Sequence, residues 1–380
     1  MSIFRICGDE GMYKKFDEIF EDVTKLGTKV KTDEYHSSGK HQIIDQGQEI
    51  VAGYTDLEKG LFEDVPAIIF GDHTRIIKYV DQPFFLGADG VKVLRSRLEA
   101  ANYRYLYYAL KNVKIPNTGY NRHFKWLKTA QIKWPNAETQ SDIVAVLDRI
   151  SKIIKYRQRQ LQKLDELVKA RFVEMFGDPI SNPMKWDIYR LEECLVRIDN
   201  GKSFICSDKP RTGDNPAILK LSAATYGDYR PNENKALLDE SLFIESSEVH
   251  AGDLLFTRKN TPELVGMAAY VQNTPPKLMM PDLIFRLVPN EKVNAVFLWQ
   301  LINCKEFRPV IQAISGGSAK SMSNISKERL GKIKVICPPR ELQDSLIPFV
   351  EQIDKSKVVV QKALDETQLL FDSLMQKYFG

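Results

Sequence analysis

One long helical stripe, between Glu138 and Gly177, limits the possible folds of this chain more than any other feature. Positions alternately four and three residues apart are apolar in eight of ten cases, namely Ile143, Leu147, Ile150, Ile154, Arg157, Leu161, Leu164, Val168, Arg171 and Met175. An apolar repeat of about 3.5 residues predicts the seam of a coiled coil. About forty residues at 1.5 Å each make a helix of roughly 60 Å, which needs a partner of similar length.

The sequence predicts that partner within the same chain. Residues 334–380 align with residues 131–177 at a constant offset of 203 without a gap, and ten of the 47 positions are identical. Composition alone would give about three. The stripe is repeated as Leu346, Val350, Ile353, Lys357, Val360, Leu364, Thr367, Phe371, Leu374 and Tyr378. Two long helices, each following a larger globular segment, indicate an internal duplication.

We therefore expect an α+β fold with a pseudo-twofold internal repeat, in which two domains (1–134 and 178–333) are separated by two long antiparallel helices (135–177 and 334–380). The seam between the helices is expected to contain Ile143, Leu147, Ile150, Ile154, Leu161, Leu164, Val168, Leu346, Val350, Ile353, Val360, Leu364, Phe371 and Leu374. Pro348 removes an amide donor near the start of the second helix, so this helix is expected to bend or to begin later. Whether Arg157 and Arg171 pair across the seam stays open.

Short apolar and alternating runs predict the strands of both domains. They are Lys29–Thr32, Gln42–Asp45, Val65–Gly71 and Arg75–Val80 in the first domain, and Ala217–Leu221, Leu254–Thr257, Met267–Val271 and Leu283–Leu287 in the second. Residues 102–111 predict a helix in the first domain. Strands mixed with a few helices are typical of α+β domains.

Composition narrows the class of protein. The 380 residues suffice for two or more domains, and a net charge of +4 neither requires nor excludes a nucleic-acid partner. The five cysteines are scattered and never form a CxxC pair, which argues for a reducing compartment and against a structural zinc. No signal peptide and no long apolar run is recognisable, so we expect a cytoplasmic protein without a membrane segment.

Two segments lack acidic residues. Residues 100–137 contain seven Lys or Arg residues, eight aromatic residues and no Asp or Glu. The second copy repeats the pattern at residues 307–327, around the glycine-containing loop 315–321. Cations neutralise phosphates, and aromatic or amide side chains can contact bases, so this composition favours a DNA-facing surface. A basic, solvated surface is the simpler alternative.

The candidate DNA-contacting residues are the cationic, aromatic and amide side chains of these segments and of the polar loops. Arg258, Lys259 and Asn260 follow a buried strand, where Arg suits guanine and Asn suits adenine in the major groove, although an exposed turn explains them nearly as well. The full set is Lys40, Arg75, Tyr120, Arg122, Lys125, Arg211, Tyr226, Arg230, Arg258, Lys259, Asn260, Lys320 and Ser321.

Signatures of covalent chemistry were not found. Asn273-Thr274-Pro275-Pro276-Lys277 lacks the spacing and the aromatic residue of an adenine methyltransferase motif. Residues 316–321 lack the first glycine of a phosphate-binding loop, and the five histidines show no metal-ligand spacing. We therefore predict no catalytic residue, no metal site and no cofactor in this chain.

The chain resembles the DNA-specificity subunits of type I restriction-modification systems. The resemblance depends on Pro135 with Glu138-Thr139-Gln140, on residues 175–179 (MFGDP) with Asn182 and Trp186, on residues 338–343 (PPRELQ), and on residues 44–47 (IDQG), 66–71 (PAIIFG) and 251–257 (AGDLLFT). These motifs cover the chain from end to end in the order of the family. The resemblance implies that the two domains are target-recognition domains that read a bipartite, asymmetric DNA target.

The resemblance also implies the partners. Two modification subunits, which bind S-adenosylmethionine and methylate adenine, would flank the chain. Restriction subunits that use ATP and Mg for translocation could join them, so the cofactors would belong to the partners. Two other classes stay open: a self-sufficient DNA-modifying enzyme, and a coiled-coil scaffold without a DNA role.

Overall fold

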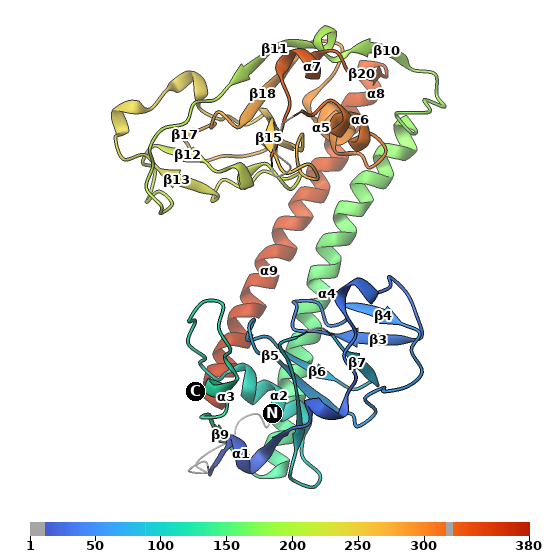
Figure 1. Ribbon diagram of the computed structural model, residues 1–380. Coiled ribbons are helices and arrows are strands. Elements are labelled where there is room, and N and C mark those ends of the chain that lie inside the picture. Colours follow the sequence, from blue (N-terminus) through green and yellow to red (C-terminus); the bar gives the residue numbers. More distant parts are fainter. Residues whose placement is uncertain (1–11, 88, 317–321) are drawn as a thin grey trace, which may run out of the picture. The chain divides into compact units, whose positions relative to one another are not determined.

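The computed structural model describes residues 12–87, 89–316 and 322–380, which form two compact units. The first unit contains the chain up to Arg159 together with Gln361–Gly380, and the second contains Gln160–Val360. Two long helices, α4 (Ala137–Phe176) and α9 (Ile347–Phe379), each contribute to both units (Figure 1). Within the part of the chain described, no helix has the length and apolarity that crossing a membrane requires.

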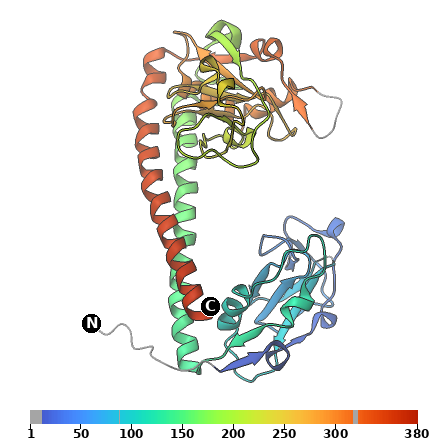
Figure 2. The same cartoon turned by 90° about the vertical axis from the view of Figure 1, so that its left-hand side faces the viewer.

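Three small sheets build the first unit. Their strand orders are β2-β8-β5-β6, β4-β3-β7 and β1-β9, and among the described strands of this unit β3 and β7 alone are paired in parallel. The sheets lie to one side of the long helices (Figure 2). The elements are β1 (Tyr13–Lys15), α1 (Phe16–Ile19), β2 (Phe20–Asp22), β3 (His41–Ile44), β4 (Gly53–Thr55), β5 (Ala67–Gly71), β6 (Ile77–Val80), β7 (Phe84–Leu86), β8 (Val91–Ser96), α2 (Tyr103–Lys111), α3 (Phe124–Leu127) and β9 (Gln131–Lys133).

The second unit repeats this topology. Its sheets have the orders β11-β18-β14-β16, β13-β12-β17 and β10-β20, with an added pair β15-β19, and β12 and β17 are parallel. The elements are β10 (Asp187–Arg190), β11 (Leu195–Asn200), β12 (Ala217–Leu219), β13 (Asn234–Ala236), β14 (Leu254–Thr257), β15 (Lys259–Asn260), β16 (Ala268–Tyr270), β17 (Leu278–Met279), β18 (Ile284–Pro289), α5 (Ala295–Asn303), α6 (Arg308–Ala313), β19 (Ser323–Asn324), α7 (Lys327–Gly331), β20 (Lys334–Cys337) and α8 (Arg340–Asp344).

Individual contacts are repeated as well. Gln140 Nε2 donates to the carbonyl of Pro135 at 2.9 Å, and Gln343 Nε2 donates to the carbonyl of Pro338 at 2.8 Å. The rings of Tyr105 and Phe379 lie 5.3 Å apart in the first unit, and those of Phe297 and Phe176 lie 4.9 Å apart in the second. The predicted α+β class and the internal repeat are therefore confirmed.

The long helices pack against each other in both units, in opposite directions. In the first unit the beginning of α4 and the end of α9 share a hydrophobic core, and in the second unit the end of α4 and the beginning of α9 do so. The buried contributors are Ile143, Leu147, Ile150, Phe371, Met375 and Tyr378 in the first unit, and Val168, Phe172, Phe176, Leu346, Val350 and Ile353 in the second. Ile154, Leu161, Leu164, Leu364 and Leu374 are half-buried, and Val360 is buried. Antiparallel pairing of the helices follows.

The polar side chains of the seam find partners. Arg157 donates to the carbonyl of Ala363 and to Thr367 Oγ1 in the first unit. Lys357 pairs with Asp165 in the second unit, where the Arg171 guanidinium also lies 5.9 Å from the ring of Phe349. Paired polar groups in an apolar seam fix the register of the helices.

The structure corrects one predicted strand and shows where the second long helix begins. The strand predicted at Lys29–Thr32 is wrong: Lys29 makes one isolated bridge to Leu86, and Thr32–Glu34 is a 3₁₀ turn, because the Glu34 carboxylate accepts the amide of Lys31 at 3.0 Å. The second long helix begins late. Short helix α8 precedes it, and α9 starts at Ile347 with Pro348 in its first turn, where a missing amide donor costs no helical hydrogen bond.

Candidate nucleic-acid interface

A loop cluster of the first unit presents an exposed aromatic ring. Tyr120 is 87% exposed and stacks on His73, with ring centroids 4.6 Å apart and planes 7° apart. His73 lies in the turn between β5 and β6, and its Nδ1 is buried without a hydrogen-bond partner. An exposed ring held flat by a second ring is a surface on which a nucleobase can stack.

A buried polar contact fixes the base of this cluster. His123 is fully buried, and its amide and Nδ1 both lie against the carbonyl of Asp72, at 2.8 and 3.0 Å. The Asp72 carboxylate accepts the amide of Phe124 at 2.7 Å. These hydrogen bonds therefore join the turn between β5 and β6 to the loop that contains Tyr120. Sequence reasoning missed His73, Asp72 and His123 because isolated residues of these types show no periodicity and no ligand spacing.

Three cations lie near this cluster, Arg75 and Arg122 on the two loops and Lys125 in the first turn of α3. Arg75 has a φ of 62° and reaches the carbonyl of Ile115 at 3.4 Å, while Arg122 and Lys125 are exposed. The Lys125 ammonium lies 5.3 Å from the ring centroid of Trp126. Lys40 lies on a different loop, where it pairs with Glu58 at 3.1 Å. Arg75, Tyr120, Arg122 and Lys125 therefore form one candidate surface, which we call the first-unit loop cluster.

The acid-free composition of residues 100–137 has a second cause besides a charged surface. Several of its aromatic side chains, Tyr105, Tyr108 and Phe124 among them, are buried in the core of the first unit. Burial and the hydrogen bond to the Asp148 carboxylate both raise the pKa of Tyr108. Arg104 is held by Asp148 and lies over the ring of Tyr79 at 4.7 Å. Composition alone therefore overstates how much of this segment faces solvent.

The second unit presents one exposed aromatic–cation pair. Tyr226 is 55% exposed, the Arg230 guanidinium lies 4.6 Å from its ring centroid, and Arg230 Nε donates to Asp228 at 2.8 Å. Arg211, in contrast, has a side chain only 7% exposed that donates to the carbonyls of Asn215 and Pro276. The Arg211 guanidinium is therefore used within the unit.

The three residues after β14 differ in their access to solvent. Asn260 is buried and donates to Thr225 Oγ1 at 3.1 Å, and Arg258 is half-buried, with a bond to Asn324 at 3.3 Å. Lys259 lies 3.9 Å from Asp282. The β15-β19 pair thus ties this segment to β19. Asn260 can contact a base only if it gives up its hydrogen bond to Thr225. Lys320 and Ser321 lie outside the described residues.

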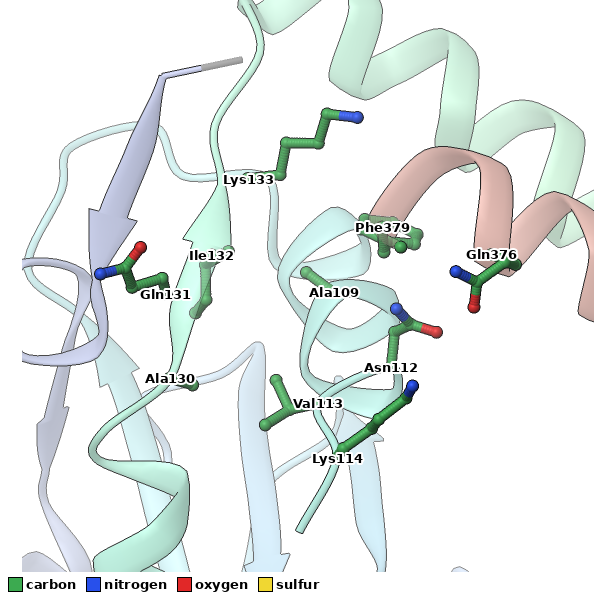
Figure 3. A pocket seen from close by; sticks show the side chains of 11 residues that line it. Ala109, Asn112, Val113, Lys114, Ala130, Gln131, Ile132, Lys133, Gln376 and Phe379 are labelled. Carbon is green, nitrogen blue, oxygen red and sulfur yellow. The ribbon is translucent and has the colours of Figure 1, made fainter.

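A shallow cavity of about 310 Å³ lies in the first unit between α2, β9 and the end of α9 (Figure 3). Its polar lining includes Asn112, Lys114, Lys133 and Gln376, and no acidic side chain lines it. It contains none of the candidate residues named from the sequence. Among the described residues, no group of three His, Cys, Asp or Glu side chains is arranged to hold a metal ion.

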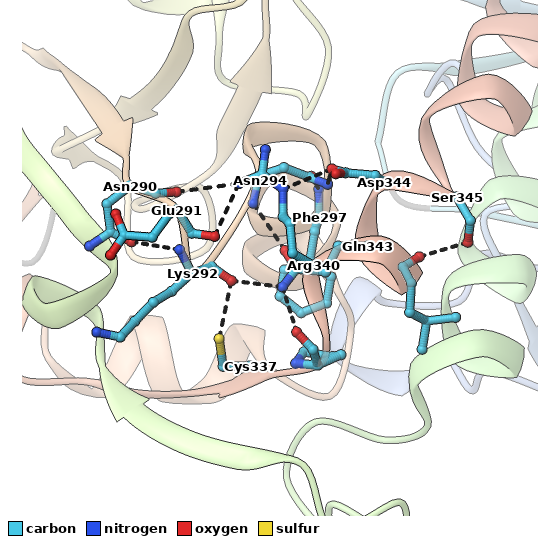
Figure 4. A network of polar contacts seen from close by, with 12 residues as sticks. Asn290, Glu291, Lys292, Asn294, Phe297, Cys337, Arg340, Gln343, Asp344 and Ser345 are labelled. Carbon is cyan, nitrogen blue, oxygen red and sulfur yellow. Dashed lines mark hydrogen bonds and ion pairs between the residues drawn. The ribbon is translucent and has the colours of Figure 1, made fainter.

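Each unit contains a polar network that joins two of its helices. In the second unit, Asn294 caps α5 by accepting the amide of Phe297 at 2.6 Å, donates to Asp344 of α8, and its own amide donates to Gln343 (Figure 4). In the first unit, the Asp148 carboxylate of α4 accepts from Arg104 and from the Tyr108 hydroxyl, both on α2. The network of the second unit joins α5 to α8, the short helix that precedes α9, and the network of the first unit joins α2 to the long helix α4.

The fold thus defines a class: duplicated α+β proteins whose two units share a pair of long antiparallel helices. Residues 9–166 match the family model described as "Type I restriction modification DNA specificity domain". This segment is therefore similar to the DNA-specificity domains of type I restriction-modification systems.

Several known proteins are similar to larger parts of the chain. The chain is 30% identical over 250 residues to the specificity subunit of the type I restriction enzyme EcoEI from Escherichia coli, a match that covers 63% of this chain and 41% of that protein. The EcoR124I/EcoR124II specificity subunit of the same species is 21% identical over 363 residues, covering 88% and 84%. The S subunit from M. genitalium has a similar fold, with a TM-score of 0.58, 15% identity and coverage of 99% and 98%.

Proposed function

We propose that this chain is the DNA-specificity subunit of a type I restriction-modification complex and reads a bipartite, asymmetric double-stranded target. One observation carries the proposal: the same topology occurs twice, on one helix pair, with different loops in the two copies. The family description of residues 9–166 as a DNA specificity domain supports it. Two different sets of loops on one duplicated fold suit the recognition of two different DNA half-sites, which we call words.

Residues 1–134 and 178–333 would be the two target-recognition domains, and residues 135–177 and 334–380 the spacer helices. The exposed base-contact candidates are Tyr120, Arg122 and Lys125 in the first domain and Tyr226 with Arg230 in the second. Each combines a ring or a cationic group with access to solvent, the properties that stacking on bases and contacts to phosphates require. Arg75, Arg258 and Lys259 are half-buried, and the exposed Lys40 pairs with Glu58, so these four would contribute less to DNA binding.

The helix pair would set the distance between the two DNA words. A helix of 40 residues is about 60 Å long, against about 34 Å for one turn of DNA. The number of base pairs between the two words would then follow from helix length and not from base contacts.

Exposed apolar side chains on the long helices suggest where other subunits dock. Leu369 is 70% and Leu370 52% exposed in the first unit, and Val358 and Val359 are each 69% exposed in the second. Adjacent exposed apolar side chains are typical of interaction surfaces. We propose that two modification subunits bind these surfaces and supply S-adenosylmethionine-dependent adenine methylation, and that restriction subunits with ATP and Mg can join them. The chain itself would catalyse no covalent step, and it would act in the cytoplasm.

Mapping methylated adenines across the host genome, with and without this chain, tests the proposal. The expected result is a split recognition sequence, modified on both strands, that disappears when the chain is removed and returns when it is supplied again. Substitution of Tyr226 and Arg230 by Ala together should change or abolish one word only, since the other word is read by the other domain. Methylation that persists without the chain, or a chain that binds duplex DNA in no assembly, would refute the proposal.

A further inference from the structure

One face of α4 carries the domain of the first unit and continues beyond it. Val144 and Asp148 lie on this face: Val144 packs against the core of the unit, and Asp148 binds Arg104 and Tyr108 of α2. At 100° per residue, Lys155 and Arg159 point within about 20° of the direction of Asp148. They lie about 10 and 16 Å further along the helix. The same face thus changes from a domain contact to a pair of cations.

These two cations have no partner within the described structure. Lys155 and Arg159 are both exposed, and neither forms an ion pair or a side-chain hydrogen bond with a described residue. No acidic residue occurs between Asp148 and Asp165. Their i, i+4 spacing places two positive charges side by side, which destabilises a helix unless an anion neutralises them.

The cationic face is duplicated only in part. At the offset of 203 residues, Lys155 corresponds to Val358 of α9, which is 69% exposed, whereas Arg159 corresponds to Lys362, another exposed cation. A role in helix pairing, which both copies share, therefore does not explain the charge of Lys155. A partner that contacts the two units differently would explain this charge, and an asymmetric DNA target is such a partner.

We propose that Lys155 and Arg159 bind backbone phosphates of the non-specific DNA next to the word read by the first domain. This inference depends on the proposed function. A duplex that is bound by the first domain and runs along α4 would contact the face of α4 against which that domain packs. Ammonium and guanidinium groups bind phosphates without reading sequence, so the contact would add affinity and fix the path of the duplex but leave the recognised words unchanged.

The test uses the full chain assembled with its modification subunits and a duplex carrying the mapped target. Lys155→Gln, Arg159→Gln and the double variant are compared with Arg149→Gln, which removes an exposed charge of the same acid-free stretch about 120° away from Lys155 on the helix. Gln is a good helix former, so the helix is expected to persist, and circular dichroism checks this. In a second set of duplexes, neutral methylphosphonates replace the phosphates at one end of the spacer or at the other.

Each phosphate contact changes the slope of log K against log salt concentration by about 0.9, so the double variant is expected to reduce the slope by about 1 to 2. At 0.15 M salt the affinity should fall about 5-fold for each lost contact. Arg149→Gln should leave both values unchanged. Methylphosphonates should weaken binding of the unmodified protein at one end of the spacer only, and should have no further effect on the double variant.

Two results would overturn the inference. One is a double variant with the salt slope of Arg149→Gln. The other is a double variant that fails to assemble with the modification subunits, which would assign the cations to a protein contact. Either result leaves the proposed function standing as long as the unmodified protein still selects its target. Absence of target selection by the unmodified protein would instead refute the proposed function itself.

Discussion

Asp148 joins α2 of the first unit to the long helix α4. Its carboxylate accepts from Arg104 and, at 2.6 Å, from the Tyr108 hydroxyl, and the Asp148 side chain is 30% exposed. Asp148→Asn keeps the shape but removes the charge that Arg104 pairs with. We expect the free energy of unfolding to fall by about 1–2 kcal/mol in urea titrations. Asp142→Asn, on the same helix and exposed, is the control and should change it by less than about 0.5 kcal/mol. Equal effects would contradict the assignment.

Asp22 gives the first unit a pH-dependent contribution to stability. Burial raises the pKa of this carboxyl, but hydrogen bonds from Lys92 and Thr24 outweigh burial and lower the pKa below its ordinary value. A folded pKa below the unfolded pKa means that the stabilisation is present above about pH 4 and is lost as the pH falls through the folded pKa. Asp22→Asn should therefore cost about 1 kcal/mol of unfolding free energy at pH 7 and less below pH 4. A cost that stays constant from pH 7 to pH 3 would exclude this origin.

The sequence specifies the individual residues of the site less closely than it specifies the long helices. Arg211 and Asn260 have the side-chain chemistry of base contacts, yet Arg211 binds two carbonyls and Asn260 is buried against Thr225. Sequence patterns report which side chains occur near a strand end but not which way they point. Tyr120 and Arg122 lie in a loop whose composition matched the expectation and are exposed. Whether they contact DNA stays a prediction.

At the scale of elements, the seam of the helix pair depends on a polar contact. Arg157 of α4 donates to Ala363 and Thr367 of α9 from a position that is apolar elsewhere in the stripe. Arg157→Ala removes both bonds and the packing of the aliphatic stem, so the free energy of unfolding should fall by about 1–3 kcal/mol. Arg149→Ala, exposed on the same helix, should be nearly neutral. Thermal unfolding of both variants measures the difference, and a neutral Arg157→Ala would show that the contact does not stabilise the pair.

Elements were predictable where a pattern is long or repeated. The stripe of α4 and its copy in α9 extend over many turns, so the helices, their length and their antiparallel partner followed from periodicity. Near its end α4 buries Phe172 and Phe176, each one residue beyond the stripe positions Arg171 and Met175, which are half-buried. The cause is tertiary: Phe297 of α5 packs against both rings and rotates the buried face of the helix toward the domain. Contacts with a distant element leave no periodic signal in the helix itself.

At the scale of the whole molecule, the length of the helix pair is expected to determine the distance between the two DNA sites. The two recognition domains would be mounted on one helix pair, so the length of that pair would set the number of base pairs between the two DNA words. Because α4 and α9 run in opposite directions, a matched insertion of one heptad in each lengthens the pair and preserves the seam.

The most direct test inserts seven residues after Arg159 in α4 and seven after Gln361 in α9, and maps the methylated adenines that the altered chain specifies. Seven helical residues add about 10 Å, or about three base pairs of duplex DNA. We expect both words to stay the same and the spacer between them to grow by about three base pairs. An assembled, active complex that still selects the original spacer would contradict this expectation.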